Sequence, residues 1–230
     1  MSGTLYRFKD DPYSSHALIL SRLGAGHGRR TLDVGAADGF LATELTARDW
    51  KVTALERDPA QAALAAARCE QAITVDLERE RPALAGLYDA AIYGDVIEHL
   101  SDPLGVMREL NRHLAPGALV IVSVPNVAHL SVRLSLLFGR FEYGNRGILD
   151  RTHLRFFTRR TFVEFLGRAG LTVRELAVTP APLPLVVPER FHGRWLDVVH
   201  RFSAGMARVW PGGLAYQFVA VCAKARTGER

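Results

Sequence analysis

Thr31-Leu32-Asp33-Val34-Gly35-Ala36-Ala37-Asp38-Gly39-Phe40 is the stretch that decides the fold of this 230-residue chain. Its first four residues predict a short buried strand, and Phe40 begins a segment with helical period. A glycine-containing turn between a strand and a helix brings backbone N–H groups close to a ligand, because glycine has no side chain in the way. The spacing is Gly-x-x-x-Gly rather than Gly-x-Gly-x-x-Gly, so the turn suits a nicotinamide dinucleotide poorly.

Strands and helices alternate on both sides of this turn. The expected strands are Thr31–Val34, Lys51–Glu56, Ile73–Asp76, Tyr88–Tyr93, Ala118–Val124, Leu171–Val178 and Gln217–Ala225. The expected helices are Pro12–Leu23, Phe40–Arg48, Asp58-Pro59 to about Cys69, Ser101-Asp102-Pro103 to about Leu114, Val127–Phe138, Thr161–Ala169 and Glu189–Val209, with a polar loop over Asn145–Thr158. This alternation implies right-handed crossovers and a doubly wound, Rossmann-like, mostly parallel sheet in the α/β class.

Composition sets limits on the protein class. Hydrophobic residues make up 48% and charged residues 23%, which is typical of a globular domain. No apolar run approaches the roughly 18 residues of a membrane span, and Met1–Tyr13 has no apolar signal-peptide centre, so we expect a cytoplasmic protein. Cys69 and Cys222 are too few for a disulfide framework or a zinc site.

The net charge of +5 comes mostly from arginine. It indicates either a solvated arginine-rich surface or attraction to an anionic partner such as a sugar nucleotide, a lipid phosphate or nucleic acid. No basic run interleaved with aromatic residues supports nucleic acid, which is therefore an unlikely partner.

Carboxylates stand at the expected strand ends. Glu56 lies 21 positions after Gly35, the spacing at which an acidic residue grips a ribose diol. Asp76 is expected at the same sheet edge, where it could reach an adenine amino group or simply cap a turn. Asp33 lies within the first strand, where a carboxylate is costly unless it orients the turn or holds a ligand ammonium group.

With these residues in place, the chain resembles the class I S-adenosylmethionine-dependent methyltransferases. Within them it is similar to the branch that includes ubiquinone-biosynthesis O-methyltransferases and many proteins encoded beside glycosyltransferases. The matching motifs are Leu32–Phe40, Ala54–Asp58, Val75–Glu78, Tyr88-Asp89, Gly94–Leu100, Leu114–Ala118, Val124–Asn126 and Leu149–Thr158.

The resemblance implies S-adenosylmethionine as cofactor and a seven-stranded sheet whose last strand is antiparallel. It also implies a single domain with an N-terminal helical cover (1–28), a cofactor-binding core (29–125) and an acceptor-side half (126–230). The family's middle glycine is replaced by Ala37, which we expect to serve with a negative φ. The cofactor-binding residues implied are Asp33, Gly35, Ala36, Ala37, Gly39, Phe40, Glu56, Arg57, Asp76, Leu77, Gly94, Asp95, Val96 and His16.

Three histidines are candidates for a general base that takes a proton from the acceptor. His153 lies where the acceptor pocket is expected, and Asp150 could orient it. His99 follows the fourth strand, and His16 lies on the N-terminal helix, where it could also cover the cofactor. In related quinone methyltransferases a Glu98-His99-type pair lies near a candidate metal, but the sequence offers no full ligand set, so we predict no metal. A structural role remains open for each histidine.

Two further features bear on the acceptor. Arg151 and Arg155 could bind an anionic acceptor or lie in surface ion pairs. The insertion over 180–213 is expected to form a lid, with a peripheral membrane contact or a homodimer face as alternatives. Its apolar side would consist of Phe191, Trp195, Leu196, Val198, Val199, Phe202 and Met206.

The first functional hypothesis is methyl transfer to a hydroxyl oxygen of a small-molecule or glycan acceptor. Transfer to nitrogen or carbon of a small molecule, to a protein or to nucleic acid is the alternative. Enzymes that methylate base amino groups often carry Asn/Asp-Pro-Pro-aromatic where this chain has Gly94-Asp95-Val96-Ile97, which argues against them. A non-catalytic nucleotide-binding protein is the least favoured hypothesis.

Overall fold

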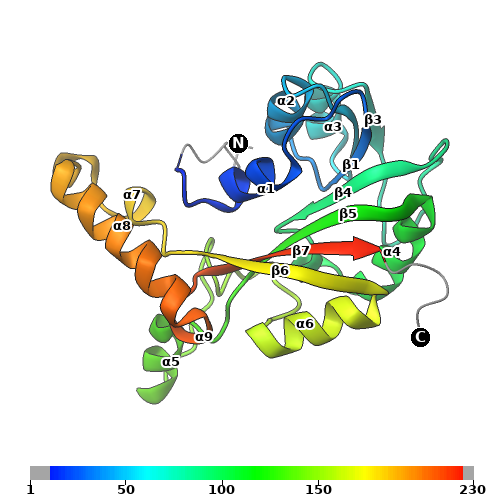
Figure 1. Cartoon of the computed structure of the whole chain (residues 1–230). Coiled ribbons are helices and arrows are strands. Elements are labelled where there is room, and N and C mark those ends of the chain that lie inside the picture. The colour runs from blue at the N-terminus through cyan, green and yellow to red at the C-terminus, as the bar shows by residue number, and fades with distance from the viewer. Residues whose placement is uncertain (1–10, 225–230) are drawn as a thin grey trace.

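The computed structural model describes residues 11–224, which form one seven-stranded sheet with helices on both faces (Figure 1). The strand order is β3-β2-β1-β4-β5-β7-β6, and β7 runs antiparallel to both neighbours while the other pairings are parallel. This confirms the predicted fold class. The strands are β1 (Arg30–Val34), β2 (Lys51–Glu56), β3 (Gln71–Thr74), β4 (Tyr88–Gly94), β5 (Leu114–Pro125), β6 (Leu171–Thr179) and β7 (Gln217–Lys224).

The helices follow the predicted order with shifted ends. Those of four residues or more are α1 (Ser15–Leu23), α2 (Phe40–Thr46), α3 (Pro59–Ala65), α4 (Pro103–Leu110), α5 (Leu130–Leu137), α6 (Arg159–Arg168), α7 (Leu183–Val186), α8 (Arg194–Val209) and α9 (Pro211–Leu214). Short 3-10 turns cover Ile97–His99, Asn111–His113 and Glu189–Phe191. Residues 1–10 of the expected N-terminal cover and Ala225 of the last strand lie outside the described residues.

Predicted boundaries are wrong at several elements, among them the start of α8, which lies at Arg194 rather than at Glu189. Helix α3 ends at Ala65 rather than near Cys69, and α4 ends at Leu110, so that Leu114 already begins β5. Strand β3 ends at Thr74, which leaves Asp76 two residues beyond it. The predicted helix starts hold better: Asp58 and Asp102 each cap a helix whose first residue is proline, and their carboxylates accept backbone N–H bonds.

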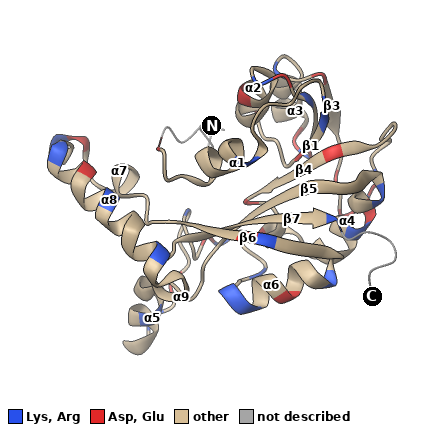
Figure 2. Cartoon of the chain, viewed as in Figure 1, with Lys and Arg blue, Asp and Glu red and all other residues tan. Residues whose placement is uncertain are grey.

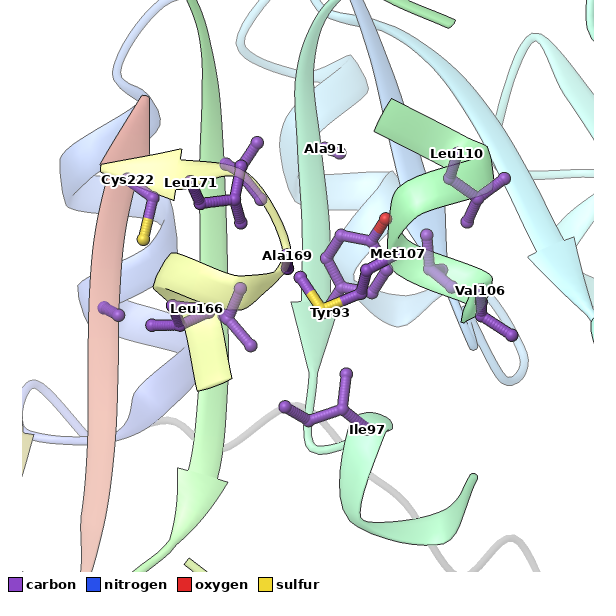
Figure 3. Packing of buried hydrophobic residues seen from close by; sticks show 14 of the residues in the cluster. Ala91, Tyr93, Ile97, Val106, Met107, Leu110, Leu166, Ala169, Leu171 and Cys222 are labelled. Atoms are coloured by element: carbon purple, nitrogen blue, oxygen red, sulfur yellow. The ribbon is translucent and has the colours of Figure 1, made fainter. Parts of the chain in front are cut away.

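The core lies in two layers, one on each face of the sheet. Alternate residues of β4 separate them: Ala91 and Tyr93 join the cluster under α4 and α6, while Ala90 and Ile92 join the cluster under α1 and α2. Figure 3 shows the first layer, in which Met107 from α4 and Leu166 from α6 pack over the sheet. Apart from Ser123, the segment Ala118–Val124 of β5 is apolar on both faces, as expected for a strand in the middle of a sheet covered on both sides.

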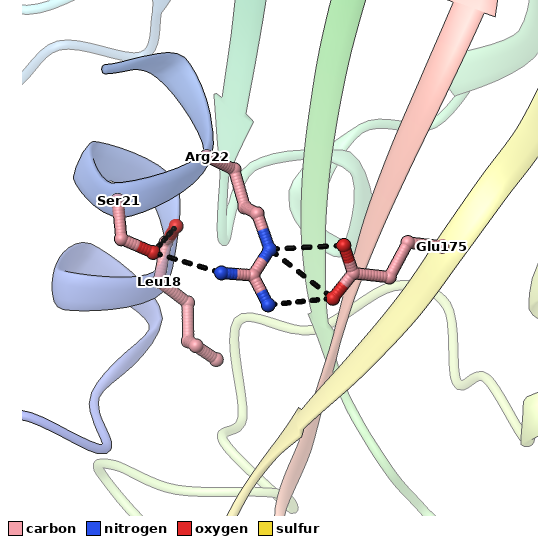
Figure 4. Close-up of polar contacts among 4 residues, drawn as sticks. All are labelled: Leu18, Ser21, Arg22 and Glu175. Carbon is pink, nitrogen blue, oxygen red and sulfur yellow. Dashed lines mark hydrogen bonds and ion pairs between the residues drawn. The ribbon is translucent and has the colours of Figure 1, made fainter.

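Helix α1 crosses the sheet and is fastened at its far end to β6. The Arg22 guanidinium donates to both carboxylate oxygens of Glu175 at 2.6–3.1 Å and to the Ser21 hydroxyl at 3.1 Å (Figure 4). This hydrogen bonding lowers the pKa of Glu175. Both side chains are well exposed, so the pair fixes the direction of α1 more than it adds stability.

The insertion does not pack as predicted. Of its seven apolar residues named from the sequence, only Leu196 is buried; the other six are exposed. Helix α8 contacts the domain instead through a narrow face of Leu196, His200, Ala204 and Ala207. No helix among residues 11–224 is long and apolar enough to cross a membrane.

Candidate active site at the carboxyl edge of the sheet

The turn after β1 requires residues without bulk. Gly35 and Gly39 both have positive φ, at 70° and 80°. A Cβ on Gly35 would lie 2.5 Å from a methyl carbon of Val96, and one on Gly39 would lie 2.9 Å from the Cα of Ala65. The turn is therefore packed tightly against Val96, just after β4, and against α3. Glycine allows this close packing and also lets the backbone approach a ligand.

Ala37 departs from the predicted backbone. Its φ is +49°, in the left-handed region, so the expectation of a negative φ is wrong. The left-handed conformation costs a residue with a Cβ about 1–2 kcal/mol. A hydrogen bond offsets this cost, because in this conformation the Ala37 N–H donates to the Glu56 carboxylate at 2.8 Å. The bond connects the turn to the end of β2.

Glu56 lies directly against this turn. Its Oε2 accepts the Ala37 N–H, and its Oε1 accepts the N–H groups of Arg57 and Asp58 at 2.8 and 2.9 Å. A carboxylate has about four lone-pair sites, so these three bonds leave capacity for a ligand hydroxyl. The carboxylate is thus pre-positioned at the edge of the sheet, next to the backbone of the turn.

Asp33 is a buried carboxyl beneath the turn. Its Oδ2 has no hydrogen-bond partner among the described residues. Burial, and then the nearby charge of Glu56, raise the pKa of Asp33 to about 7. A buried carboxylate oxygen in this condition fits a cationic ligand group such as the ammonium of S-adenosylmethionine, which would supply the missing donor.

Asp76 stands beside Glu56 although it lies outside the strand. The N–H of Val75 donates to the Glu56 carbonyl at 2.8 Å, which brings the two strand ends together. The Asp76 carboxylate accepts the Glu78 N–H at 3.1 Å and lies 3.6 Å from the Arg79 Nε. Leu77 is partly buried against the core, and Arg57 is exposed.

Asp95 is held by two residues that the sequence analysis missed. Its φ is +56°, and its carboxylate accepts from the Ser123 hydroxyl at 2.6 Å and from the Gln217 amide at 2.8 Å. Ser123 also accepts the Asp95 N–H at 3.0 Å. The only sequence signal was a polar residue inside the apolar strand β5 and another at the start of β7.

Helix α1 packs over the carboxyl ends of β1 and β4. The ring of His16 packs on the ring of Phe40, with centroids 4.7 Å apart, and a Cβ at Gly94 would lie 3.8 Å from Ile19. His16 is buried. The N-terminal helix, the turn after β1 and the end of β4 therefore meet at one place.

Glu98, His99 and His153 come together although His153 is far from the other two in the sequence. One ligand atom from each lies within 4.8 Å of the others, and the two imidazole centroids are 4.8 Å apart. The His153 Nδ1 lies 3.1 Å from the Ile148 carbonyl and the His99 Nδ1 lies 3.2 Å from the Thr152 carbonyl. Because carbonyls only accept, both Nδ1 atoms donate, and the neutral form of each imidazole has its lone pair on Nε2.

This cluster corrects the expectation that no ligand set exists. Two imidazoles and one carboxylate can occupy one face of a divalent cation and leave its other positions open. Burial lowers the pKa of His153, so that its imidazole is neutral at pH 7, as both a metal ligand and a general base must be. The third member was missed because His153 is 54 residues from His99 and joins it only through the fold.

Asp150 does not orient His153 as predicted. Its Oδ1 accepts the Thr152 N–H at 2.8 Å and the Thr152 hydroxyl at 2.7 Å, so it caps a turn. These hydrogen bonds lower the pKa of Asp150 against the effect of burial. The Ile148 carbonyl orients the imidazole instead.

The two arginines expected to bind an anion contact backbone carbonyls. Arg155 donates to Leu100 at 3.3 Å and to Ser101, and the Arg151 Nε lies 3.4 Å from the Gly144 carbonyl. Each side chain therefore holds a loop in place.

A small cavity opens at the ends of β6 and β7, next to the Asp95–Gln217 contact. Its volume is about 90 Å³, and its lining is mostly apolar. The lining includes Tyr13, Thr179, Pro182, Leu185, Tyr216 and Gln217. Among the described residues of the insertion over 180–213, those that line the cavity all belong to its proline-rich start.

Comparisons with known proteins agree with this geometry. A family model described as a methyltransferase domain matches residues 12–176. A ubiquinone biosynthesis O-methyltransferase from Marinobacter nauticus is 30% identical over 65% of this chain and 66% of its own length. One from Aeromonas salmonicida is 28% identical over 72% of each chain. The matches therefore span about two thirds of the length of these relatives.

Solved structures support the fold. A methyltransferase dependent on S-adenosylmethionine from Archaeoglobus fulgidus superposes with a TM-score of 0.61 at 13% identity, over 91% of this chain and 94% of that one. The cyclase SpnF gives a TM-score of 0.63 at 19% identity, over 98% of this chain and 86% of that one. Because one of these two neighbours is named a cyclase, the superpositions support the fold and not a particular activity.

Proposed function

Because the chain belongs to the methyltransferase-domain family of S-adenosylmethionine-dependent enzymes, we propose that it transfers a methyl group to a hydroxyl oxygen of a small-molecule or glycan acceptor. The observation that supports this most is the pair of neighbouring imidazoles, His99 and His153, whose ring centroids are 4.8 Å apart. A hydroxyl acceptor has a proton to lose, and these side chains are suited to receive it. The relatives named O-methyltransferases favour the same chemistry.

The proposed cofactor site uses the turn and the strand ends. The backbone from Gly35 to Gly39 would frame the methionine part, with Ala36 and Phe40 beside it. Glu56 would accept hydrogen bonds from the ribose hydroxyls, next to Arg57. Asp76 and Leu77 would contact the adenine. Near the sulfonium and the amino group we place Asp33, Gly94, Asp95, Val96 and the covering His16.

Methyl transfer to a hydroxyl requires that the acceptor oxygen, the methyl carbon and the sulfur be aligned, and that one proton be removed. Bound S-adenosylmethionine would supply a methyl group activated by its sulfonium, the acceptor oxygen would displace S-adenosylhomocysteine from that methyl group, and the hydroxyl proton would pass to His153 or His99. Alignment in a closed site can contribute roughly 7–11 kcal/mol. The Asp95 carboxylate, which Ser123 and Gln217 hold by hydrogen bonds, would keep the methionine end of the cofactor in position during the transfer.

A divalent cation held by Glu98, His99 and His153 would supply Lewis-acid polarisation of the acceptor oxygen. In either role Nε2 would be the reacting atom of His153, because Nδ1 is hydrogen-bonded to the Ile148 carbonyl. We propose that His153 has one of these two roles, and treatment with a chelator distinguishes them. If the chelator abolishes turnover and an added divalent cation restores it, His153 is a metal ligand.

For His153→Ala we expect turnover to fall at least about tenfold while affinity for S-adenosylhomocysteine stays within about twofold. We propose that the imidazole contacts the acceptor and not the cofactor, so the variant should bind the cofactor as wild type does. Turnover is followed by methyl transfer and affinity by calorimetry. His113→Ala, a histidine of the turn before β5, serves as the matched control. Wild-type turnover in the His153 variant would remove this residue from the reaction.

The acceptor is tested by offering sugar nucleotides, lipid-linked glycans and phenols with the cofactor and weighing the products. A product heavier by one methyl on oxygen supports the proposal, and methylation of nitrogen or carbon favours the alternative. Anionic acceptors are included because of the net charge of +5. Calorimetry with S-adenosylhomocysteine against NAD tests the least favoured hypothesis, since binding of NAD alone would support it.

A further inference from the structure

Helix α8 carries two different apolar faces. The narrow one, formed by Leu196, Ala204 and Ala207 with His200, is buried against the domain. The wide one points to solvent, with Trp195 56%, Phe202 69% and Val209 78% exposed. Val198, Val199 and Met206 continue this exposed stripe at helical spacing. The domain therefore uses one face of α8 and leaves a second, larger one uncovered.

The stripe is bordered by a line of arginines. Arg194, Arg201 and Arg208 are spaced seven residues apart, so they lie along one side of the helix. Figure 2 shows basic positions, drawn blue, along the ribbon of α8. All three are exposed, and none forms an ion pair with the carboxylates that the structure describes. A bare apolar stripe edged by unpaired cations is typical of a helix that lies in the plane of a membrane interface.

Neighbouring elements extend the same character. Leu185 and Val186 of α7, which contacts α8, are exposed, as are Leu137 and Phe138 at the end of α5. Figure 1 shows α5, α8 and α9 gathered at one end of the molecule. Arg133 of α5 donates to the Gly212 carbonyl of α9 at 3.1 Å, which fixes α5 beside α9. Exposed apolar area of this extent is unusual for a monomer without a partner.

We propose that α8 docks this protein on an anionic lipid bilayer, with the stripe of Trp195, Val198, Phe202, Met206 and Val209 inserted between headgroups and Arg194, Arg201 and Arg208 on lipid phosphates. Helix α8 begins after residue 176, where the family match ends, so the surface belongs to the part of the chain outside that match. The proposal does not depend on the identity of the acceptor.

Charge favours a bilayer over a second copy of this chain. The segment from Glu189 to Val209 carries four arginines, Arg190, Arg194, Arg201 and Arg208, against the two acids Glu189 and Asp197. A two-fold pairing of α8 stripes would bring this basic excess against itself, whereas an anionic headgroup layer complements it. A tryptophan such as Trp195 is also a side chain that membrane interfaces favour.

The test is sedimentation of the full chain with phosphatidylcholine vesicles that contain or lack phosphatidylglycerol. We expect binding to the anionic vesicles, weakened by salt, and little binding to the neutral ones. Phe202→Glu should reduce partitioning by about tenfold or more, and Arg201→Gln by about fivefold. Val163→Glu, a similar change at an exposed valine of α6, is the matched control and should leave binding unchanged.

Circular dichroism and S-adenosylhomocysteine affinity check that each variant is folded. Absence of binding to anionic vesicles, or equal binding by the Phe202→Glu and Val163→Glu variants, would overturn the proposal. So would a wild-type dimer that Phe202→Glu converts to a monomer without any vesicle binding, because the stripe would then be a homodimer face.

Discussion

Replacement of Glu56 by glutamine is expected to weaken S-adenosylhomocysteine binding about a hundredfold. The carboxylate accepts three backbone N–H groups, and we propose that the ribose diol binds the same two oxygens, with one hydroxyl at the remaining lone-pair site and the other sharing an oxygen with a backbone N–H. Glutamine loses the charge and turns an N–H₂ group either toward Ala37 or toward Arg57 and Asp58. Hydrogen bonds to a charged group contribute about 1.5–3 kcal/mol each, so the loss of two corresponds to at least that hundredfold effect.

One effect acts in the opposite direction. The charge of Glu56 helps to raise the pKa of Asp33, so its removal makes Asp33 ionise more easily and bind a cationic ligand group better. Burial is the larger cause of that raised pKa, so this gain offsets only part of the loss. Isothermal titration calorimetry measures the net change. Glu80→Gln, at an exposed acid of the neighbouring turn, should bind like wild type. Equal affinities for the two variants would mean that Glu56 does not contact the ligand.

Replacement of Asp33 by asparagine should stabilise the ligand-free protein and weaken its cofactor binding. A carboxyl whose pKa is near 3.8 when unfolded and about 7 when folded loses stability as the pH rises between these values. Full ionisation of such a group costs about 4 kcal/mol, and an amide with a polar atom of its own recovers roughly 2–4 kcal/mol of it. The gain should be absent near pH 4 and complete above pH 7.

Urea unfolding at pH 5 and pH 8 measures this gain as the difference between variant and wild type, which removes the titration of other groups. Asp49→Asn, at an exposed aspartate, is the control and should show no such pH dependence. Calorimetry should show weaker binding of S-adenosylhomocysteine, whose ammonium loses its carboxylate partner. A variant that is less stable than wild type at pH 8 would show that Asp33 has a favourable partner in the folded protein.

Local signals predicted most of the fold. The alternation of strands and helices, the glycines of the turn and the Asp-Pro helix starts act over a few residues, and the structure bears them out. Boundaries failed where no local stop signal marks the end of an element, as in the alanine-rich α3, which ends at Ala65 although the strong helix former alanine continues to Ala67. The left-handed Ala37 could not be predicted either, since the Glu56 carboxylate that stabilises it comes from the next strand.

Contacts between distant residues account for the rest of the site. Ser123 and Gln217 reach Asp95 only because β5 lies between β4 and β7. His99 and His153 meet through the loop that follows β5. For α8, the sequence has apolar residues on two faces, and periodicity alone cannot tell which one the domain covers. The small side chains of Ala204 and Ala207 allow close packing, so the wide face with Phe202 remains outside.

The most direct measurement is a crystal structure of the complex with S-adenosylhomocysteine. The two ribose hydroxyls should lie within hydrogen-bonding distance of the Glu56 side chain, with the homocysteine part along the backbone of Gly35 to Gly39. A nucleoside bound elsewhere, with Glu56 still satisfied by protein N–H groups alone, would contradict the account.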